Sequence, residues 1–209
     1  MNPRRMQVLA WSLSVSVALI AIFAWAQGLG FKFTGLGFYQ IFPVFGLLAY
    51  SLMWAHYVSA ATRLYFKIDR AVLVQYFEIT GMVVLASILL HPGLLAWQAW
   101  RDGMGLPPSS QIRYVAPMLG VYVVIGIIAY IAFLSFELRR KFGARPWFKY
   151  ISYASDIGMF LIILHSLKLG SHLQIGWFRT LWYLYGVTYF IAVGYIYYLK
   201  FAPKPKVKA

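Results

Sequence analysis

Two histidines lie at matched positions in two different apolar segments. His91 follows Ile88-Leu89-Leu90 and precedes Pro92, and His165 follows the apolar run 161–164. An imidazole inside an apolar membrane segment is costly unless a partner satisfies it. Two imidazoles at equal depth on facing helices are the axial ligand set of a b-type haem. The structural alternative is that each ring only donates to a backbone carbonyl across a helix interface.

The depth of the pair follows from helix geometry. Each histidine lies eighteen residues beyond the predicted start of its segment, at Leu73 or Trp147. At about 1.5 Å per residue, each histidine lies roughly 27 Å from the start of its helix, toward the external face. Pro92 kinks its helix and opens room for a porphyrin edge. His172 lies in an external connector, where we expect it to be solvated and within reach of a haem propionate.

The composition is that of an integral membrane protein. The chain is 62% hydrophobic and 11% charged, with a mean hydropathy of +0.69. Soluble domains carry about 25% charged residues. The chain has no cysteine, which excludes thiol catalysis, iron–sulfur clusters, disulfides and covalent haem attachment.

Six stretches are long and apolar enough to span a membrane, which needs about 20 residues. The predicted fold is therefore all-α: a polytopic membrane protein with a six-helix bundle forming a single domain, 1–202, and a disordered basic tail, 203–209. No internal repeat is visible in the sequence. The predicted spans are 7–27, 38–62, 73–98, 114–137, 147–168 and 176–199.

The cations predict the orientation. Fourteen of the 19 Lys and Arg residues fall at the termini and in alternate connectors, and five fall on the other side. The positive-inside rule then puts both termini in the cytoplasm of a plasma (inner) membrane. The net charge of +14 is explained by lipid head groups rather than by nucleic acid. An alternative is that residues 1–26 form a cleavable signal, because Ala24-Trp25-Ala26 resembles a cleavage site.

Three further polar residues fall within the inner half of the predicted spans: His56, Glu78 and Asp156. Intramembrane carboxylates are expensive and usually face a cavity or a partner. Grouped together, these residues would form a quinol or proton site below the histidine pair. The alternative is a structural network that ties three helices together.

These motifs resemble the ferric reductase-like transmembrane domain, and within it the haem-binding membrane subunit of the bacterial methionine sulfoxide reductase system. The resemblance covers residues 38–199. Gly81 precedes His91 by ten residues, and the stretch 143–147, Tyr153 and His165 resemble the family's basic loop, aromatic residue and last histidine. The resemblance implies haem b, a separate electron donor (a cytoplasmic flavoprotein or membrane quinol), and an external acceptor protein or ferric chelate.

The chain departs from that family at the inner haem position. Family members carry another histidine 13 or 14 residues before the last one, where this chain has Ile151 and Ser152. The equivalent position before His91 is Phe77. None of these is an ordinary haem ligand, so one haem is expected.

The sequence leaves three functions open. The first is haem-dependent electron transfer to the external face, which would make the chain an oxidoreductase subunit. The second is a proton-coupled transporter or channel that uses His56, Glu78 and Asp156 without haem. The third is an intramembrane hydrolase with Ser152 or Ser166 as nucleophile, although no G-x-S-x-G turn supports it.

Overall fold

The computed structural model describes residues 1–137 and 145–202, apart from five side chains near the gap. The predicted tail, 203–209, lies outside the described residues, as do residues 139–144 of the basic connector before the fifth predicted span. The described chain is helical and contains no strand. The predicted all-α class is confirmed for these residues.

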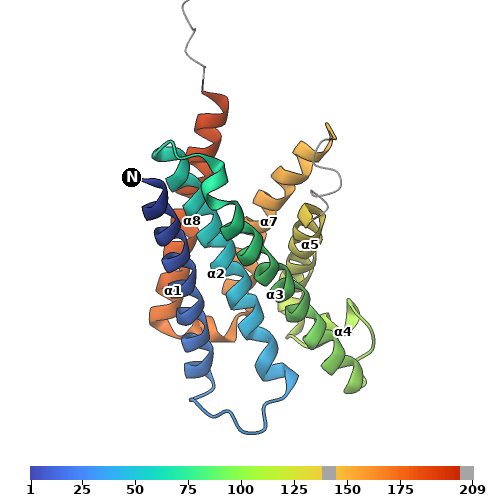
Figure 1. Cartoon of the computed structure of the whole chain (residues 1–209). Helices are drawn as coiled ribbons and strands as arrows, with labels where there is room; N and C mark the ends of the chain where they lie inside the picture. The colour runs from blue at the N-terminus through green and yellow to red at the C-terminus, as the bar shows by residue number, and fades with distance from the viewer. Residues whose placement is uncertain (138–144, 203–209) are drawn as a thin grey trace, which may run out of the picture.

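Within the described ranges, six long helices run along one another (Figure 1). Both ends of the described chain lie at the same end of the bundle. The long helices are α1 (Pro3–Gly28), α2 (Phe38–Tyr65), α3 (Val74–Arg101), α5 (Gly120–Glu137), α7 (Phe148–Leu169) and α8 (Gly176–Phe201). The short ones are η1 (Arg70–Leu73), α4 (Ser109–Arg113), η2 (Pro117–Leu119) and η3 (Ser171–Gln174).

Local sequence explains where several helices begin and end. The side chain of Asn2 accepts a 2.8 Å hydrogen bond from the backbone N–H of Arg5, with Pro3 at the first helical position. After α3, Gly103 adopts a φ of +75°, a left-handed conformation that glycine reaches more easily than other residues. α5 begins at Gly120 rather than at the predicted position 114. Pro117 explains the difference, since it lacks an N–H and holds Ala116 in an extended conformation.

The helices form two groups. α2 packs along α1, α3 and α8, whereas α5 and α7 pack along each other as a hairpin. Few backbone contacts join α7 to α8. Aromatic stacking connects α2 to α8: Tyr50 lies 4.5 Å from Trp182 between ring centroids, and Trp54 lies 4.3 Å from Tyr185. These rings hold the first group together, whereas the α5–α7 hairpin makes few backbone contacts with α8.

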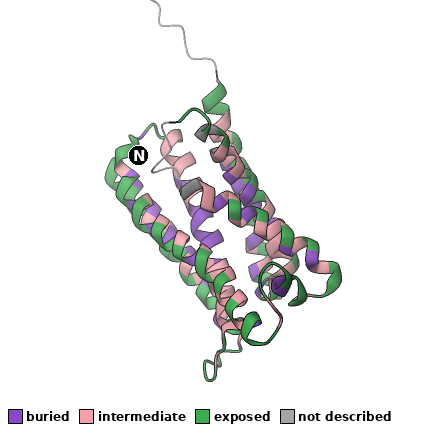
Figure 2. Ribbon diagram, turned by 90° about the vertical axis from the view of Figure 1, so that its right-hand side faces the viewer, coloured by how far each residue is buried: buried purple, intermediate pink, exposed green. Residues whose placement is uncertain are grey.

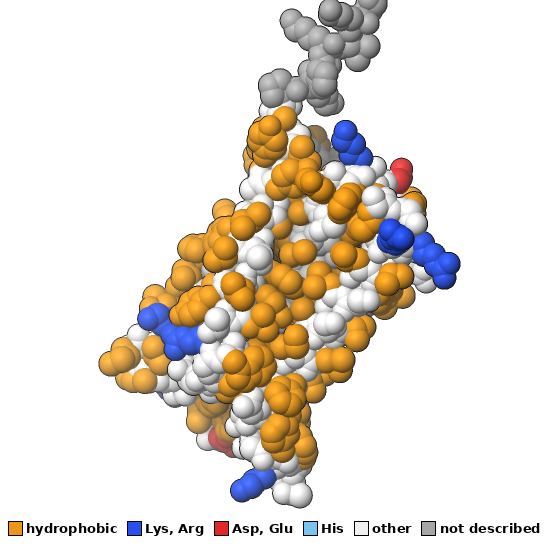
Figure 3. Space-filling model, turned by 90° about the vertical axis from the view of Figure 1, so that its left-hand side faces the viewer, with side chains coloured by type: hydrophobic (Ala, Val, Ile, Leu, Met, Phe, Trp, Pro, Cys, Tyr) orange, Lys and Arg blue, Asp and Glu red, His pale blue; other side chains and the backbone are white. Residues whose placement is uncertain are grey.

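The surface is apolar, as expected for a protein surrounded by lipid. Hydrophobic side chains cover most of the face in Figure 3, and Lys and Arg residues gather toward its ends. Buried residues form stripes on the inward sides of the helices in Figure 2. Several of the buried residues are polar, including Ser14, Ser51, Ser59, Thr80 and Ser87. Their hydroxyls lie in the interior rather than facing lipid.

Four of the described helices are long and apolar enough to cross a membrane, where six spans were predicted. They are Pro3–Gly28, Phe38–Tyr65, Arg70–Arg101 and Pro117–Ser135. α7 and α8 have 22 and 26 residues, but their sequences are more polar. α7 carries Asp156 and Lys168, and α8 is rich in tyrosine. The chain thus has the helices of a multi-pass membrane protein.

Candidate functional site

The structure brings His91 of α3 and His165 of α7 together. Their ring centroids lie 6.4 Å apart, and the ring planes are 82° from parallel. Each ring is half-buried. The pair therefore bridges the two helix groups, one histidine from each.

His91 is fixed by the first turns of α2. Its Nδ1 lies 3.0 Å from the carbonyl oxygen of Phe42. One turn further along α2, a Cβ added at Gly46 would lie 2.7 Å from Nδ1 and Cε1 of the ring. Only a residue without a side chain leaves room for the imidazole at this position.

His165 is fixed by α5 in the same way. Its Nδ1 lies 2.8 Å from the carbonyl oxygen of Tyr122. A Cβ added at Gly126, again four residues later, would overlap the imidazole ring. The two histidines thus have equivalent seats, each made by an aromatic residue and a glycine at i and i+4. The hairpins α2–α3 and α5–α7 therefore repeat one arrangement.

These contacts indicate which nitrogen of each imidazole ring carries a proton. A backbone carbonyl is only an acceptor, so each Nδ1 carries the proton and donates it. In the neutral imidazole each Nε2 is then the unprotonated nitrogen, and neither Nε2 has a hydrogen-bond partner among the described residues. Metal-bound histidines usually have this arrangement, in which the second nitrogen donates to a carbonyl and orients the ring.

The separation of the rings fits one metal ion between them. Imidazole–metal bonds of about 2 Å on both sides would hold the ring centres roughly 6 Å apart, close to the observed 6.4 Å. Within the described residues, no three His, Cys, Asp or Glu side chains gather at a possible metal site. Haem is a metal group that needs just two ligands from the protein.

Two residues near the histidine pair, Pro92 and His172, were predicted to contact the cofactor, and they have different surroundings in the structure. Pro92 directly follows His91 inside α3, which continues to Arg101. His172 was expected to be solvated, and this prediction is wrong. Its side chain is 8% exposed and packs against Gly28 of α1. This burial lowers the pKa of the His172 imidazole.

His56 belongs to a separate polar network. Its Nε2 lies 2.6 Å from Oγ1 of Thr80, and Thr80 donates to the carbonyl oxygen of Tyr76. The His56 ring also packs edge-on against Tyr76 and Phe77. Ser14 of α1 shares a 2.7 Å hydrogen bond with the Tyr76 hydroxyl. This network ties α1, α2 and α3 together.

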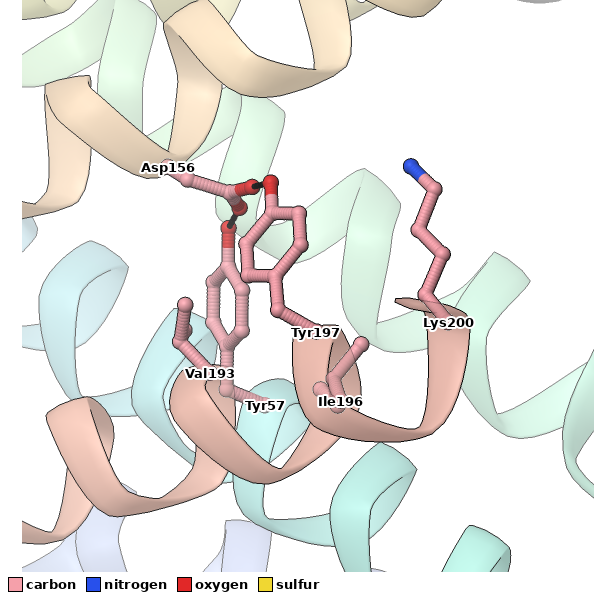
Figure 4. A pocket seen from close by; sticks show the side chains of 6 residues that line it. All are labelled: Tyr57, Asp156, Val193, Ile196, Tyr197 and Lys200. Carbon is pink, nitrogen blue, oxygen red and sulfur yellow. Dashed lines mark hydrogen bonds between the residues drawn. The ribbon is translucent and has the colours of Figure 1, made fainter. Parts of the chain in front are cut away.

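Asp156 is surrounded by tyrosines from two other helices. Tyr57 of α2 donates to Oδ1 at 2.5 Å, and Tyr197 of α8 donates to Oδ2. Tyr189 donates to the backbone carbonyl of Asp156 at 2.7 Å. Figure 4 shows the carboxylate between the hydroxyls of Tyr57 and Tyr197. Asp156 is thus the point at which α2, α7 and α8 meet.

Two hollows flank this carboxylate. One, of about 180 Å³, has both Asp156 and Lys200 in its lining, near the end of α8. The other, of about 300 Å³, lies between α7 and α8 and includes Phe160 and Phe190. Lys200 donates to the Tyr153 hydroxyl at 3.0 Å. The carboxylate therefore borders both hollows.

The structure does not group His56, Glu78 and Asp156 in the way the sequence suggested. His56 and Asp156 make separate hydrogen bonds, and the Glu78 side chain is exposed. The helical period explains the exposure: Tyr76 and Thr80 lie four residues apart on the buried face of α3, which turns Glu78 outward.

Sequence reasoning missed the two glycine seats and the tyrosine partners of Asp156. The aromatic-x-x-x-Gly spacing at 42–46 and 122–126 was the available signal. Of the proposed serine nucleophiles, Ser166 donates to the carbonyl of Ile163 and accepts from the Trp182 indole N–H. The side chain of Ser152 lies outside the described residues.

The chain was compared with models of protein families, with curated proteins and with solved structures, and none of these matched it. The functional argument therefore depends on the two sites.

Proposed function

We propose that this chain is a membrane electron-transfer protein in which His91 and His165 are the axial ligands of one b-type haem. The observation that carries the proposal is the pair of unbonded Nε2 atoms on rings 6.4 Å apart, each held by a carbonyl and a glycine. Haem would supply reversible one-electron chemistry. The resemblance to the ferric reductase-like transmembrane domain is part of this proposal.

The proposed topology has six spans with both termini in the cytoplasm of the plasma membrane. At about 1.5 Å per residue, the 22 and 26 residues of α7 and α8 are long enough to cross. The fourteen-to-five distribution of cations supports this orientation. In it, His91 and His165 lie toward the external face, and Asp156 and Lys200 lie toward the inside.

In this proposal, electrons enter from a cytoplasmic flavoprotein or a membrane quinol and leave to an external protein or ferric chelate. The inner hollows suit a lipid-soluble donor: Phe160 and Phe190 provide apolar walls, and Asp156 provides a hydrogen-bond acceptor. A basic cytoplasmic loop suits an acidic flavoprotein.

A second candidate is a proton-coupled transporter without haem. The observation in its favour is the Asp156 carboxylate, which lies inside the bundle and lines a hollow near the end of α8. Such a protein would bind no haem and would keep its activity when His91 is replaced.

The haem content distinguishes these two functions. Purified in detergent from haem-replete cells, the protein is expected to be red, with the absorption bands of low-spin b haem. We expect close to one haem per polypeptide, because Phe77, Ile151 and Ser152 occupy the possible inner positions. A pyridine haemochrome assay beside a protein assay measures the ratio. A colourless protein would end the electron-transfer proposal, and a ratio near two would end the single-haem proposal.

The direction of electron flow can be tested in vesicles. Because His91 and His165 lie toward the outer end of their helices in the proposed topology, an impermeant oxidant should oxidise reduced haem quickly in right-side-out vesicles. The same oxidant should act slowly on inside-out vesicles, where it meets only the cytoplasmic face. Stopped-flow absorbance gives both rates. Equal or reversed rates would show that the orientation or the depth of the pair is misassigned.

A further inference from the structure

The end of the bundle opposite the chain termini is basic. Among the described residues it carries one acidic side chain, Asp102, whose carboxylate accepts hydrogen bonds from the Tyr39 hydroxyl and the Gln98 amide. The cations at this end form no ion pair with a carboxylate within the described ranges, which leaves them open to an anionic ligand. These cations are Lys32, Arg101, Arg113, Lys168 and Arg179.

Lys168 lies beside the histidine pair. It follows His165 by three residues on α7, so it lies on nearly the same face of the helix, about 4.5 Å closer to the basic end. Its ammonium is 5.8 Å from the ring centroid of Tyr122. The backbone carbonyl of Tyr122 is the group that holds the imidazole of His165. The cation therefore lies about one turn beyond the imidazole, against the same residue of α5.

The other cations at this end are less well placed. Arg113 and Arg179 already donate hydrogen bonds to oxygen atoms of neighbouring residues. Arg101 lies ten residues beyond His91 on α3, a distance of about 15 Å along the helix. Lys168 is therefore the cation best placed to serve a ligand of the two histidines.

We propose that Lys168 binds a propionate carboxylate of the haem held by His91 and His165, with the propionate edge turned toward the external face. This inference rests on the proposed function. A porphyrin is apolar except at the edge that carries its propionates, and charged groups in a membrane protein are most stable where they meet water and a counter-ion. A lysine near a helix end keeps its ammonium at that level. His172, the residue expected from the sequence to contact a propionate, is buried against Gly28 instead.

The exposure of Lys168 sets the expected size of the effect. An exposed charge pair changes an equilibrium by up to about fivefold. Loss of the cation should therefore speed haem dissociation about fivefold while both axial ligands remain in place. It should also lower the midpoint potential, because a nearby cation favours ferrous iron over the more positive ferric iron.

The test uses the full-length protein carrying haem with isotope-labelled propionate carboxyls. Redox-difference infrared spectra report the labelled carboxylate bands, and transfer of haem to excess apomyoglobin reports its dissociation. Lys168→Met should shift the bands and speed the transfer about fivefold, with an unchanged low-spin visible spectrum. Lys168→Arg keeps the charge and should retain the slow transfer. Lys32→Met, which removes a cation from the connector between α1 and α2, is the matched control and should behave as the wild type.

Lys168→Gln covers the case in which Lys168→Met does not fold, and the same changes are expected of it. Unchanged carboxylate bands and an unchanged transfer rate in these variants would overturn the inference. An equal effect in Lys32→Met, or fast transfer in Lys168→Arg, would also overturn it. Loss of the low-spin spectrum in Lys168→Met would show that the lysine acts through His165 rather than on a propionate. A wild-type protein without haem would instead end the proposed function.

Discussion

Replacing either histidine of the pair with alanine should remove most of the haem. His91→Ala and His165→Ala each delete one axial ligand, and the remaining imidazole cannot supply low-spin six-coordinate iron by itself. The cost to the fold should be small, since Phe42 and Tyr122 each lose only an extra donor to a helical carbonyl. We expect at least a tenfold fall in low-spin haem per polypeptide, measured by reduced-minus-oxidised absorbance.

His172→Ala is the matched control, since it removes an imidazole that packs against Gly28 of α1 instead. It should retain the haem, although it leaves a small cavity and lowers the melting temperature. If His172→Ala lost the haem while His91→Ala kept it, the proposed ligand pair would be wrong.

Filling either glycine seat should have the second-largest effect. In Gly126→Val, the new side chain would overlap the imidazole of His165, so the ring must leave its present position beside His91. Overpacking of this kind costs about 1–3 kcal/mol. We expect the haem to be lost or to become high-spin with one axial ligand, as measured by absorption and electron paramagnetic resonance. Gly46→Val should act in the same way on His91.

Gly81 and Gly194 supply the controls, because a Cβ added at either position meets nothing within 4 Å. Gly81→Ala and Gly194→Ala should leave the haem spectrum unchanged and stabilise their helices by up to about 1 kcal/mol. Gly81 was part of the family resemblance through its spacing to His91, so this control also tests that motif. A normal low-spin spectrum in Gly126→Val would show that the ring is not held by its glycine seat.

The sequence by itself determined the features that depend on local pattern. Apolar composition and cation placement predicted a helical membrane protein, and the helices of the described chain follow the predicted segments closely. The equal eighteen-residue offsets of His91 and His165 predicted that the two rings could meet. Such predictions succeed because helix formation and rise per residue depend on neighbours along the chain.

Only the tertiary structure decided which helix faces which residue. The seats of the two histidines come from α2 and α5, His172 is buried by α1, and Asp156 is bound by α2 and α8. Those contacts join residues far apart in the sequence: Tyr57 and Asp156 are 99 positions apart, and Gly28 and His172 are 144 apart. Periodicity identifies a buried face but not the helix that covers it, because in lipid all apolar faces are equivalent. Small residues and hydrogen bonds then select the partner, and here glycines and tyrosine hydroxyls made that selection.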